Sequence, residues 1–424
     1  MKRIFLIGFC CSVSTGVSLA IPNSFTGNGG VIVVPAQPRF NADLTEEFFE
    51  VENWEANRFS GPWMNQPALG DDTVRRMRAN PTVFGSVPMS VYSYGEAGET
   101  RELAIHFLDA GPFFGYQYGG ERSREQREAG SEKRAEFSRL FRELKTDLTR
   151  RLETGCGRGA MGTIGRSEAL RTVYTEYRFD EFVIRLVARN DHSISLHLYR
   201  SDAVPSGYVD PQMVRQRGSE RAGTFLARVD RSEMGDIAID GMPMLLQGNT
   251  PYCGIHSVAM VGHYLGLRVP PETLAAGADF QNTGSARGSD LYGLYDSIAA
   301  EVGMKARRNT SLRMDRIEDQ LEDGIPVIVW RRVSMDREKV HDEHLLAWRR
   351  DPSVSLPEPT PEDRAAYPVR DLRGSPSHAS ILTGFNREDQ VVLFTEPWGD
   401  RSRNRRMRYE EMEATVYQVF SFSL

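Results

Sequence analysis

The second half of the chain mixes helical and strand-like patterns of apolar residues. Apolar residues recur at helical spacing in three segments, which predicts helices over 253–265, 291–302 and 314–321. An unbroken apolar run from Ile325 to Val329 predicts a buried strand. Residues 377–384 and 391–394 predict two further strands with a turn between them.

The first half shows shorter periodic segments. Strands are predicted at 82–84, 89–94, 103–108, 170–178, 181–189 and 193–199, the last three as a meander. Apolar residues at helical spacing predict a helix over 137–152, with Gly155 as its end. The preceding Glu- and Arg-rich run, 119–136, has no apolar period and predicts a solvated loop or helix face. Residues 41–230 are therefore expected to form an α+β domain with a mainly antiparallel sheet, without visible chemistry.

The chain begins like an exported protein. A basic head is followed by an apolar run to Cys11, and Ser18 and Ala20 are small residues suited to cleavage after Ala20. Residues 1–20 are thus predicted to be a signal peptide and 21–40 a linker or loose arm. The resulting location is secreted, periplasmic or cell-envelope. No later stretch is apolar and long enough to predict a membrane span.

The chain length limits the number of domains, and the net charge limits the kind of partner. A chain of 424 residues exceeds one ordinary domain, and a second domain is expected over 241–424, approached through the polar segment 231–240. The net charge of −6 shows no basic surplus, so a nucleic-acid partner is not expected. The Gly-rich segment 155–162 follows a helix and lacks Gly-Lys-Ser/Thr, so it is interpreted as a turn rather than a phosphate loop.

Cys253 is the candidate nucleophile. Thr250 is expected to be the N-cap of its helix and Pro251 the first helical residue, which puts Cys253 in the first turn. The positive end of the helix dipole favours thiolate over thiol there. Export would permit a disulfide between Cys253 and Cys156, but such a bond would join two domains and silence the nucleophile.

Three polar residues complete the candidate chemistry. His378 opens a predicted strand and can serve as the base, while Glu396 follows the next strand and can orient the imidazole. Asn386 and Asp400 are nearby substitutes for Glu396. The Gln247 amide and the Cys253 backbone N–H can donate to an oxyanion.

Taken together, Gln247, the pair Cys253-Gly254, His378 and Glu396-Pro397-Trp398-Gly399 resemble the bacteriocin-processing (double-glycine) peptidase-like family of papain-fold cysteine peptidases. Gly284 to Asp290, ahead of the helix 291–302, also fits that pattern. The resemblance covers roughly 241–424. It implies an α+β domain in which a helix carrying Cys packs on an antiparallel sheet carrying His. It also implies Gln247 as oxyanion donor, Cys253 as nucleophile, His378 as base and Glu396 as orienting acid, with small residues before the scissile bond.

The sequence departs from the family in two places. The family usually has Asp or Asn where this chain has Glu396, so the orienting acid is one methylene longer. The stretch 331–377 is a long charged insertion, which is expected to be a lid, a specificity loop or a segment that blocks the peptide cleft.

No metal or cofactor site is predicted. His256 and His263 share a helical face without further ligands, and a structural role is expected for both. The segment His341-Asp342-Glu343-His344 is interpreted as a surface charge cluster.

Three functions from different classes follow from these residues. The first is an exported cysteine peptidase or amidohydrolase acting on a peptide or protein substrate. The second is an acyltransferase that crosslinks through the same triad. The third is a catalytically silent binding or structural module of the cell envelope. The sequence leaves the substrate, any pro-segment and the oligomeric state open.

Overall fold

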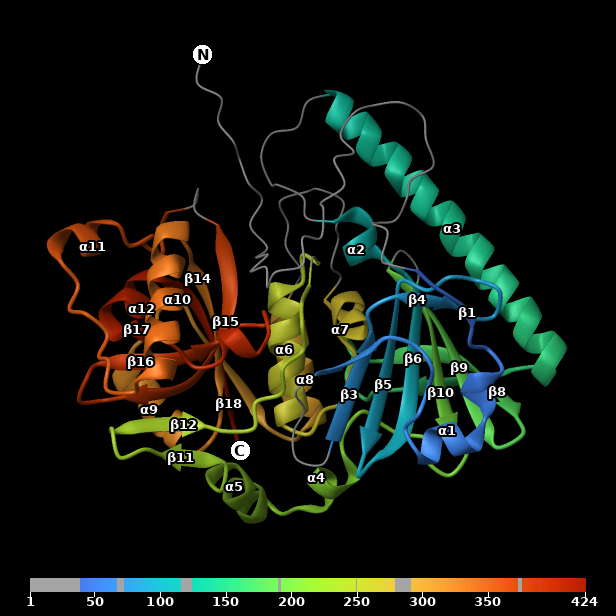
Figure 1. Ribbon diagram of the computed structural model, residues 1–424, viewed down its shortest axis with the longest axis horizontal. Helices are drawn as coiled ribbons and strands as arrows, with labels where there is room; N and C mark the ends of the chain where they lie inside the picture. The colour runs from blue at the N-terminus through green and yellow to red at the C-terminus, as the bar shows by residue number, and fades with distance from the viewer. Residues whose placement is uncertain are drawn as a thin grey trace.

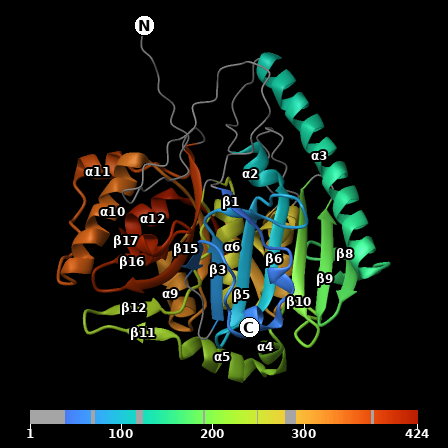
Figure 2. The same ribbon diagram turned by 45° about the vertical axis from the view of Figure 1, so that its right-hand side comes forward.

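The computed structural model describes residues 39–66, 72–115, 124–189, 192–248, 250–278, 291–372 and 376–424. The expected signal peptide, most of the arm at 21–40 and the segment Gly284 to Asp290 lie outside these ranges. The described chain builds two large sheets, each with its own hydrophobic core, and α6 (Cys253–Tyr264) lies between them (Figures 1 and 2). The mixture of helices and antiparallel strands confirms the α+β class.

The N-terminal sheet is antiparallel throughout. Its strands are, in spatial order, β2 (Trp63–Gln66), β3 (Asp72–Met77), β5 (Ser90–Glu96), β6 (Glu99–Asp109), β10 (Ser193–Arg200), β9 (Phe182–Arg189), β8 (Thr172–Phe179) and β7 (Ala160–Ile164). The strands β8, β9 and β10 form the predicted meander. The Gly-rich turn is shorter than predicted, because its second half pairs with β8 as the edge strand β7.

Two smaller differences concern local backbone geometry. The strand expected at 82–84 ends at Thr82, because Phe84 and Gly85 both have positive φ (48° and 69°) and turn the chain. That strand, β4 (Asn80–Thr82), pairs in parallel with β1 (Arg39–Asp43). A turn joins β5 and β6, with Ala97 and Gly98 at positive φ.

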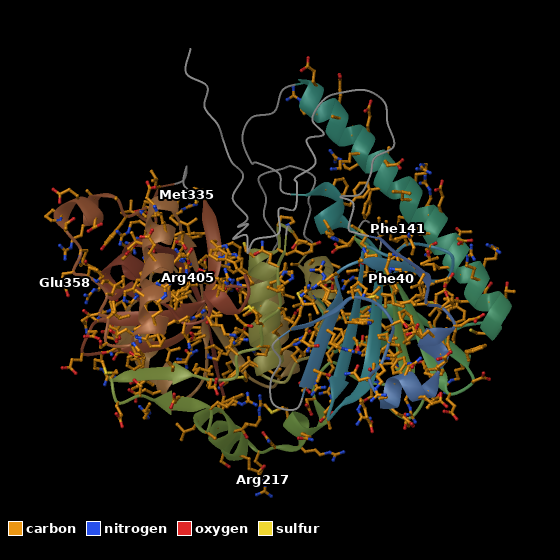
Figure 3. All side chains as sticks on the ribbon, viewed as in Figure 1. Phe40, Phe141, Arg217, Met335, Glu358 and Arg405 are labelled. Atoms are coloured by element: carbon orange, nitrogen blue, oxygen red, sulfur yellow. The ribbon has the colours of Figure 1, made fainter. Side chains whose placement is uncertain are left out.

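A long helix covers one face of the N-terminal sheet. Helix α3 runs from Arg124 to Cys156, starting well before the predicted Phe137 and ending at Gly157 (φ 78°) rather than at Gly155. Its second half packs Phe137, Phe141, Leu148 and Leu152 into the core (Figure 3 labels Phe141). The Glu- and Arg-rich first half needs no apolar period because most of its described side chains are exposed.

Short helices complete this half of the chain. They are η1 (Glu47–Phe49), α1 (Val51–Glu55), α2 (Ala110–Phe114), α4 (Pro211–Arg215) and α5 (Gly218–Leu226). Phe225 of α5 stacks on Tyr264 of α6, with ring centroids 5.9 Å apart, and so packs into the C-terminal core.

The C-terminal sheet is also antiparallel. Its main path is β11 (Val229–Arg231), β12 (Asp236–Ile239), β15 (Ser377–Asn386), β14 (Val327–Arg332), β18 (Val416–Ser423) and β13 (Lys305–Asn309), and β16 (Val391–Thr395) pairs with both β15 and β17 (Arg405–Arg408). Because β12 pairs with β15, the polar approach segment 231–240 is an integral part of this sheet. The C-terminal packing thus begins before the expected boundary at 241.

Helices flank this sheet on both sides. They are α6, α7 (Pro271–Gly277), α8 (Leu291–Glu301), α9 (Met314–Glu322), α10 (Met335–Arg350), α11 (Pro361–Ala365), η2 (Asp400–Ser402) and α12 (Tyr409–Thr415). The charged insertion forms α10 and α11. Helices α6 and α10 lie on opposite sides of β15 (Figures 1 and 2), so α10 does not lie over the start of α6. Among the described residues, no helix combines the length and apolar character needed to cross a bilayer.

Candidate active site

The helix that carries the candidate nucleophile begins at Cys253 itself. The expected cap is wrong: Thr250 Oγ1 donates to the Gln247 carbonyl (2.8 Å) instead of capping the helix. Pro251 precedes the helix, and Tyr252 takes the N-cap position without a side-chain cap hydrogen bond. The competing turn at 247–250 explains the difference, since it uses the Thr hydroxyl that a cap would need. Cys253 still occupies the first helical turn, half-buried.

Gly254 allows this helix to approach the sheet closely. A Cβ at Gly254 would lie 2.5 Å from the Trp330 ring, so any larger residue would push α6 away from β14. Farther along α6, Ser257 Oγ donates to the Ala379 carbonyl on β15 (3.2 Å). The glycine after the cysteine therefore serves the packing that brings α6 against the strand that carries His378.

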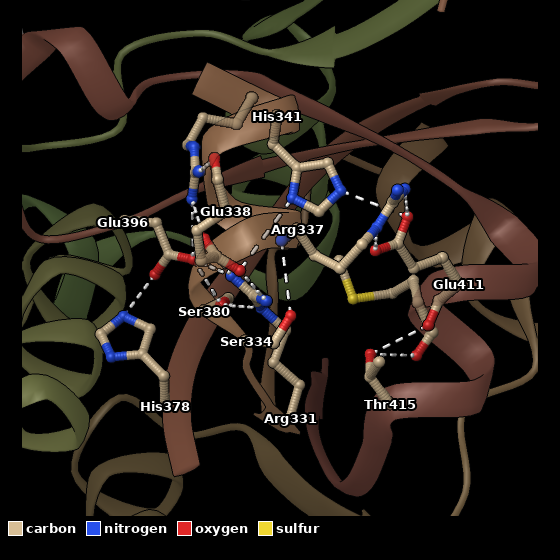
Figure 4. Close-up of polar contacts among 12 residues, drawn as sticks. Arg331, Ser334, Arg337, Glu338, His341, His378, Ser380, Glu396, Glu411 and Thr415 are labelled. Carbon is tan, nitrogen blue, oxygen red and sulfur yellow. Dashed lines mark hydrogen bonds and ion pairs between the residues drawn. The ribbon is translucent and has the colours of Figure 1, made fainter. Parts of the chain in front are cut away.

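His378 lies near the start of β15 and is oriented from two sides. Its Nε2 is 2.5 Å from Glu396 Oε2 (Figure 4), and its ring packs on Trp398 with centroids 4.7 Å apart. Its side chain also hydrogen-bonds Cys253. Because Glu396 occupies Nε2, the other ring nitrogen is the one that can serve the thiol.

Glu396 follows β16 and is fully buried. While Oε2 contacts His378, Oε1 accepts from Arg331 Nη2 (2.8 Å) and from Ser380 Oγ (2.8 Å). The structure thus brings Cys253, His378 and Glu396 together as one hydrogen-bonded series. Of the two substitutes, Asn386 donates to Asp236 (3.0 Å) at the far end of β15, and Asp400 accepts from Arg403 (2.9 Å).

The charges of this series favour a thiolate–imidazolium pair. Burial lowers the pKa of His378, but the Glu396 charge and the hydrogen bonds to Cys253 and Glu396 outweigh it and raise the pKa to about 10. Burial raises the pKa of Cys253, yet the hydrogen bond and charge of His378 bring the net pKa below its ordinary value. A proton is therefore held more firmly by the imidazole than by the sulfur.

Sequence reasoning missed a set of buried charges behind Glu396. Arg331, on β14 opposite His378, donates through Nη1 and Nη2 to Glu338 of α10 (2.7 and 3.2 Å). Arg405 donates to the same Glu338 (2.6 Å) and approaches Glu396 at 3.7 Å. Figure 3 labels Arg405 inside this half of the molecule, where its side chain has no exposed surface. One signal was available, because Arg331 ends an otherwise apolar strand.

The insertion therefore supports the site through the buried arginines that contact Glu396. Its helix α10 supplies Glu338, and a second ion pair joins Arg337 of α10 to Glu411 of α12 at 2.9 and 2.8 Å. Helix α10 packs on the side of β15 away from α6, and the expectations of a lid, a specificity loop or a block stay predictions for the rest of the insertion.

The histidine-rich segment of α10 does not converge on one point. His341 contacts Glu411 (3.2 Å), Asp342 contacts Arg405 (2.9 Å) and His344 contacts the Val354 carbonyl (3.3 Å). His341 is buried, which corrects the expected surface cluster. Across the described ranges, no group of three or more His, Cys, Asp or Glu side chains is arranged to hold a metal ion.

Gln247 is buried beside both loops of the site. Its backbone N–H donates to the Pro397 carbonyl (2.9 Å), which ties the segment before Cys253 to the segment after Glu396. Its side-chain Nε2 donates to the Thr250 carbonyl (2.6 Å). The Gln247 amide is thus engaged by the turn that precedes α6, and its expected role as oxyanion donor stays a prediction.

This fold and site define a papain-fold domain whose cysteine lies at a helix start and whose histidine lies on an antiparallel sheet. Residues 239–423 match the sequence model of the Peptidase_C39 like family, so the chain contains a double-glycine peptidase-like domain and the resemblance is confirmed. The match covers the C-terminal sheet from the last residue of β12 onward together with helices α6 to α12, and leaves β11 and the N-terminal sheet outside.

Similar solved structures include a C39-like peptidase from Bacillus anthracis, with 17% identity over 45% of this chain and 98% of that one, at a TM-score of 0.30. The peptidase domain of Streptococcus ComA, a bi-functional ABC transporter involved in quorum sensing, is 14% identical over 42% of this chain and 96% of that one, with a TM-score of 0.26. A search of curated proteins found no match.

Proposed function

We propose that the protein is a cysteine peptidase that uses Cys253 as nucleophile, His378 as acid–base and Glu396 as orienting acid. The observation that carries the proposal is the hydrogen-bonded series of these three side chains, with the pKa of the thiol lowered and that of the imidazole raised to about 10. Structural ion pairs also shift pKa values, but Cys253 is not fully buried and lies in the first turn of α6, where the helix dipole favours the thiolate.

In the proposed reaction the Cys253 sulfur attacks a peptide carbonyl carbon. The Cys253 backbone N–H and the Gln247 amide donate to the oxyanion that forms. The imidazolium of His378 gives its proton to the leaving amine, which leaves a thioester on Cys253. His378 then takes a proton from water, and the hydroxide oxygen attacks the thioester. The C–S bond breaks, which releases the acid product and restores the Cys253 thiolate beside the His378 imidazolium.

Export belongs to this proposal as well. The basic and apolar start of the chain, with Ser18 and Ala20 before the cleavage point, supports a secreted, periplasmic or cell-envelope enzyme. The substrate would then be a peptide or protein outside the cytoplasm. The described residues begin after this segment, so the assignment rests on sequence alone.

The test is labelling followed by cleavage. A fluorescent iodoacetamide should modify Cys253 in preference to Cys156, whose pKa burial raises and which serves as an internal reference thiol. A peptide library, read by mass spectrometry, should be cleaved by the wild type and not by Cys253→Ala. Adding a primary amine separates hydrolysis from acyl transfer. Equal labelling of both cysteines together with no cleavage would favour the silent module.

A further inference from the structure

The residue before the candidate nucleophile is anchored outside the C39-like domain. Tyr252 Oη donates to Asp109 Oδ1 at 2.7 Å, although Asp109 ends β6 of the N-terminal sheet. Both side chains are buried, with 2% and 6% of their surfaces exposed. A buried hydroxyl at this seam has no water to replace its partner, so the contact fixes where Tyr252 lies.

A hydrogen bond and close packing of the ring both hold Tyr252 at this contact. The same Asp109 oxygen accepts from the Gly111 N–H (3.0 Å) and thereby caps α2. A Cβ at Gly111 would lie 2.1 Å from Tyr252 Cζ, so the glycine lets α2 meet the phenol ring directly. Tyr252 is thus held at its hydroxyl and along its ring by the N-terminal sheet.

The start of α6 depends on this residue. No side-chain cap holds the helix, and the Tyr252 carbonyl accepts the first intrahelical hydrogen bond, from the His256 N–H at 2.8 Å. The Cys253 backbone follows Tyr252 directly, so a shift of Tyr252 moves the sulfur relative to His378.

We infer that Asp109 is a positioning residue for Cys253: through Tyr252, the N-terminal sheet sets the distance between the sulfur and the imidazole of His378. The N-terminal half of the chain thereby contributes to the geometry of the candidate active site. The inference rests on the proposed function, since it assigns a role to the activated thiol.

The seam around Asp109 carries further charged groups. Glu272 of α7 lies 3.6 Å from His106 of β6, and burial lowers the pKa of that histidine to about 3, which keeps it neutral. Burial, reinforced by Glu272, raises the pKa of Asp109 to about 7. Burial thus favours the neutral form, and an amide is a fair replacement because it is uncharged and keeps an acceptor oxygen.

The experiment compares two buried tyrosines of the same segment. Tyr252→Phe removes the hydroxyl that reaches Asp109, and Tyr264→Phe removes one that donates to the Gly324 carbonyl (2.7 Å) at the other end of α6. The readout is the alkylation rate of Cys253 by iodoacetamide between pH 5 and 9, with peptide mapping. Thermal unfolding of the full chain is recorded in parallel.

Tyr252→Phe should slow alkylation of Cys253 at pH 6 about three- to tenfold, the range that one buried hydrogen bond spans, and move the pH midpoint upward. Tyr264→Phe should lower thermal stability and leave the midpoint unchanged. Asp109→Asn should keep most of the wild-type rate. Gly111→Ala keeps the hydroxyl but displaces the ring, and should act in the same direction as Tyr252→Phe.

An unchanged midpoint in both Tyr252→Phe and Gly111→Ala would overturn the inference. Equal effects of Tyr252→Phe and Tyr264→Phe on the midpoint would do so too, because a general loosening of α6 would then suffice. Failure of the proposed function has a different signature: the wild-type Cys253 would itself titrate like an ordinary thiol.

Discussion

Removal of Glu338 tests whether the insertion supports the active site. Glu338→Ala deletes the carboxylate that receives three hydrogen bonds from the buried guanidinium groups of Arg331 and Arg405. Breaking a buried ion pair from one side costs about 3–5 kcal/mol, because it leaves charge buried without its partner. Here Glu396 still faces Arg331, and Asp342 still contacts Arg405 at 2.9 Å, so we expect the lower end of that range.

The matched control lies on the same helix. Glu343→Ala changes the same residue type on α10, but Glu343 and its partner Lys339 are mostly exposed, at 3.6 Å. Such a pair contributes less than about 0.5 kcal/mol. Chemical denaturation at pH 7, followed by circular dichroism, should separate the two variants by about 3 kcal/mol, or by roughly 6–12 °C in melting temperature.

A second measurement connects this network to the site. With Glu338 absent, two guanidinium groups compete for Glu396, so less negative potential reaches His378 and its pKa should fall below about 10. Titration of the imidazole by NMR measures this directly. If Glu338→Ala and Glu343→Ala prove equally stable and leave the same His378 titration, α10 contributes nothing to the site and our interpretation of the insertion is wrong.

Two further predictions concern the series of Cys253, His378 and Glu396, and a third concerns the ion pair between Arg337 and Glu411. His378→Ala should abolish cleavage and return the labelling of Cys253 to the pH profile of an ordinary thiol. Glu396→Gln keeps an acceptor oxygen and should retain part of the turnover. Wild-type activity in both variants would refute the roles of His378 as acid–base and Glu396 as orienting acid. Labelling of Cys253 should already be fast near pH 6, because its pKa is lowered, and the imidazolium should persist until pH approaches about 10. Buried carboxylates with lowered pKa values, such as Glu411 at about 2, stabilise the fold above pH 4.5 and lose that contribution as the pH falls toward 2. Acid denaturation should therefore be cooperative over that range. It should begin at higher pH in Arg337→Ala, which lacks the guanidinium that pairs with Glu411.

The sequence predicted the elements that have a strong period or a glycine stop. The apolar stripe of α6 and the three strands of the meander are found where they were expected, whereas the run at 325–329 overlaps only the first half of β14. Local hydrophobic patterns determine such elements because each must bury one face. Helix ends were less predictable: the Arg- and Glu-rich start of α3 has no apolar signal, and Thr250 had two competing uses for its hydroxyl.

Contacts between residues far apart in the sequence could not be predicted from local hydrophobic patterns. His378 and Glu396 were paired correctly because one hairpin joins them, with β15 next to β16 in the sheet. Glu338 and Arg405, by contrast, are 67 residues apart in the sequence, and Tyr252 and Asp109 are 143 apart. No periodicity links such residues, so only the folded chain reveals that they meet.

Glu396 explains why this site needs arginines behind it. A shorter Asp or Asn, the usual residue in the resembled family, reaches the histidine with less freedom, whereas Glu adds one rotatable bond that must be held. Here the two carboxylate oxygens have different partners, because Oε2 contacts His378 while Oε1 is fixed by Arg331 and Ser380. The guanidinium offsets the cost of burying the carboxylate, and Glu338 in turn offsets the cost of burying the guanidinium. The longer acid and the charged insertion, two separate departures in the sequence, are thus parts of one charge-balanced arrangement.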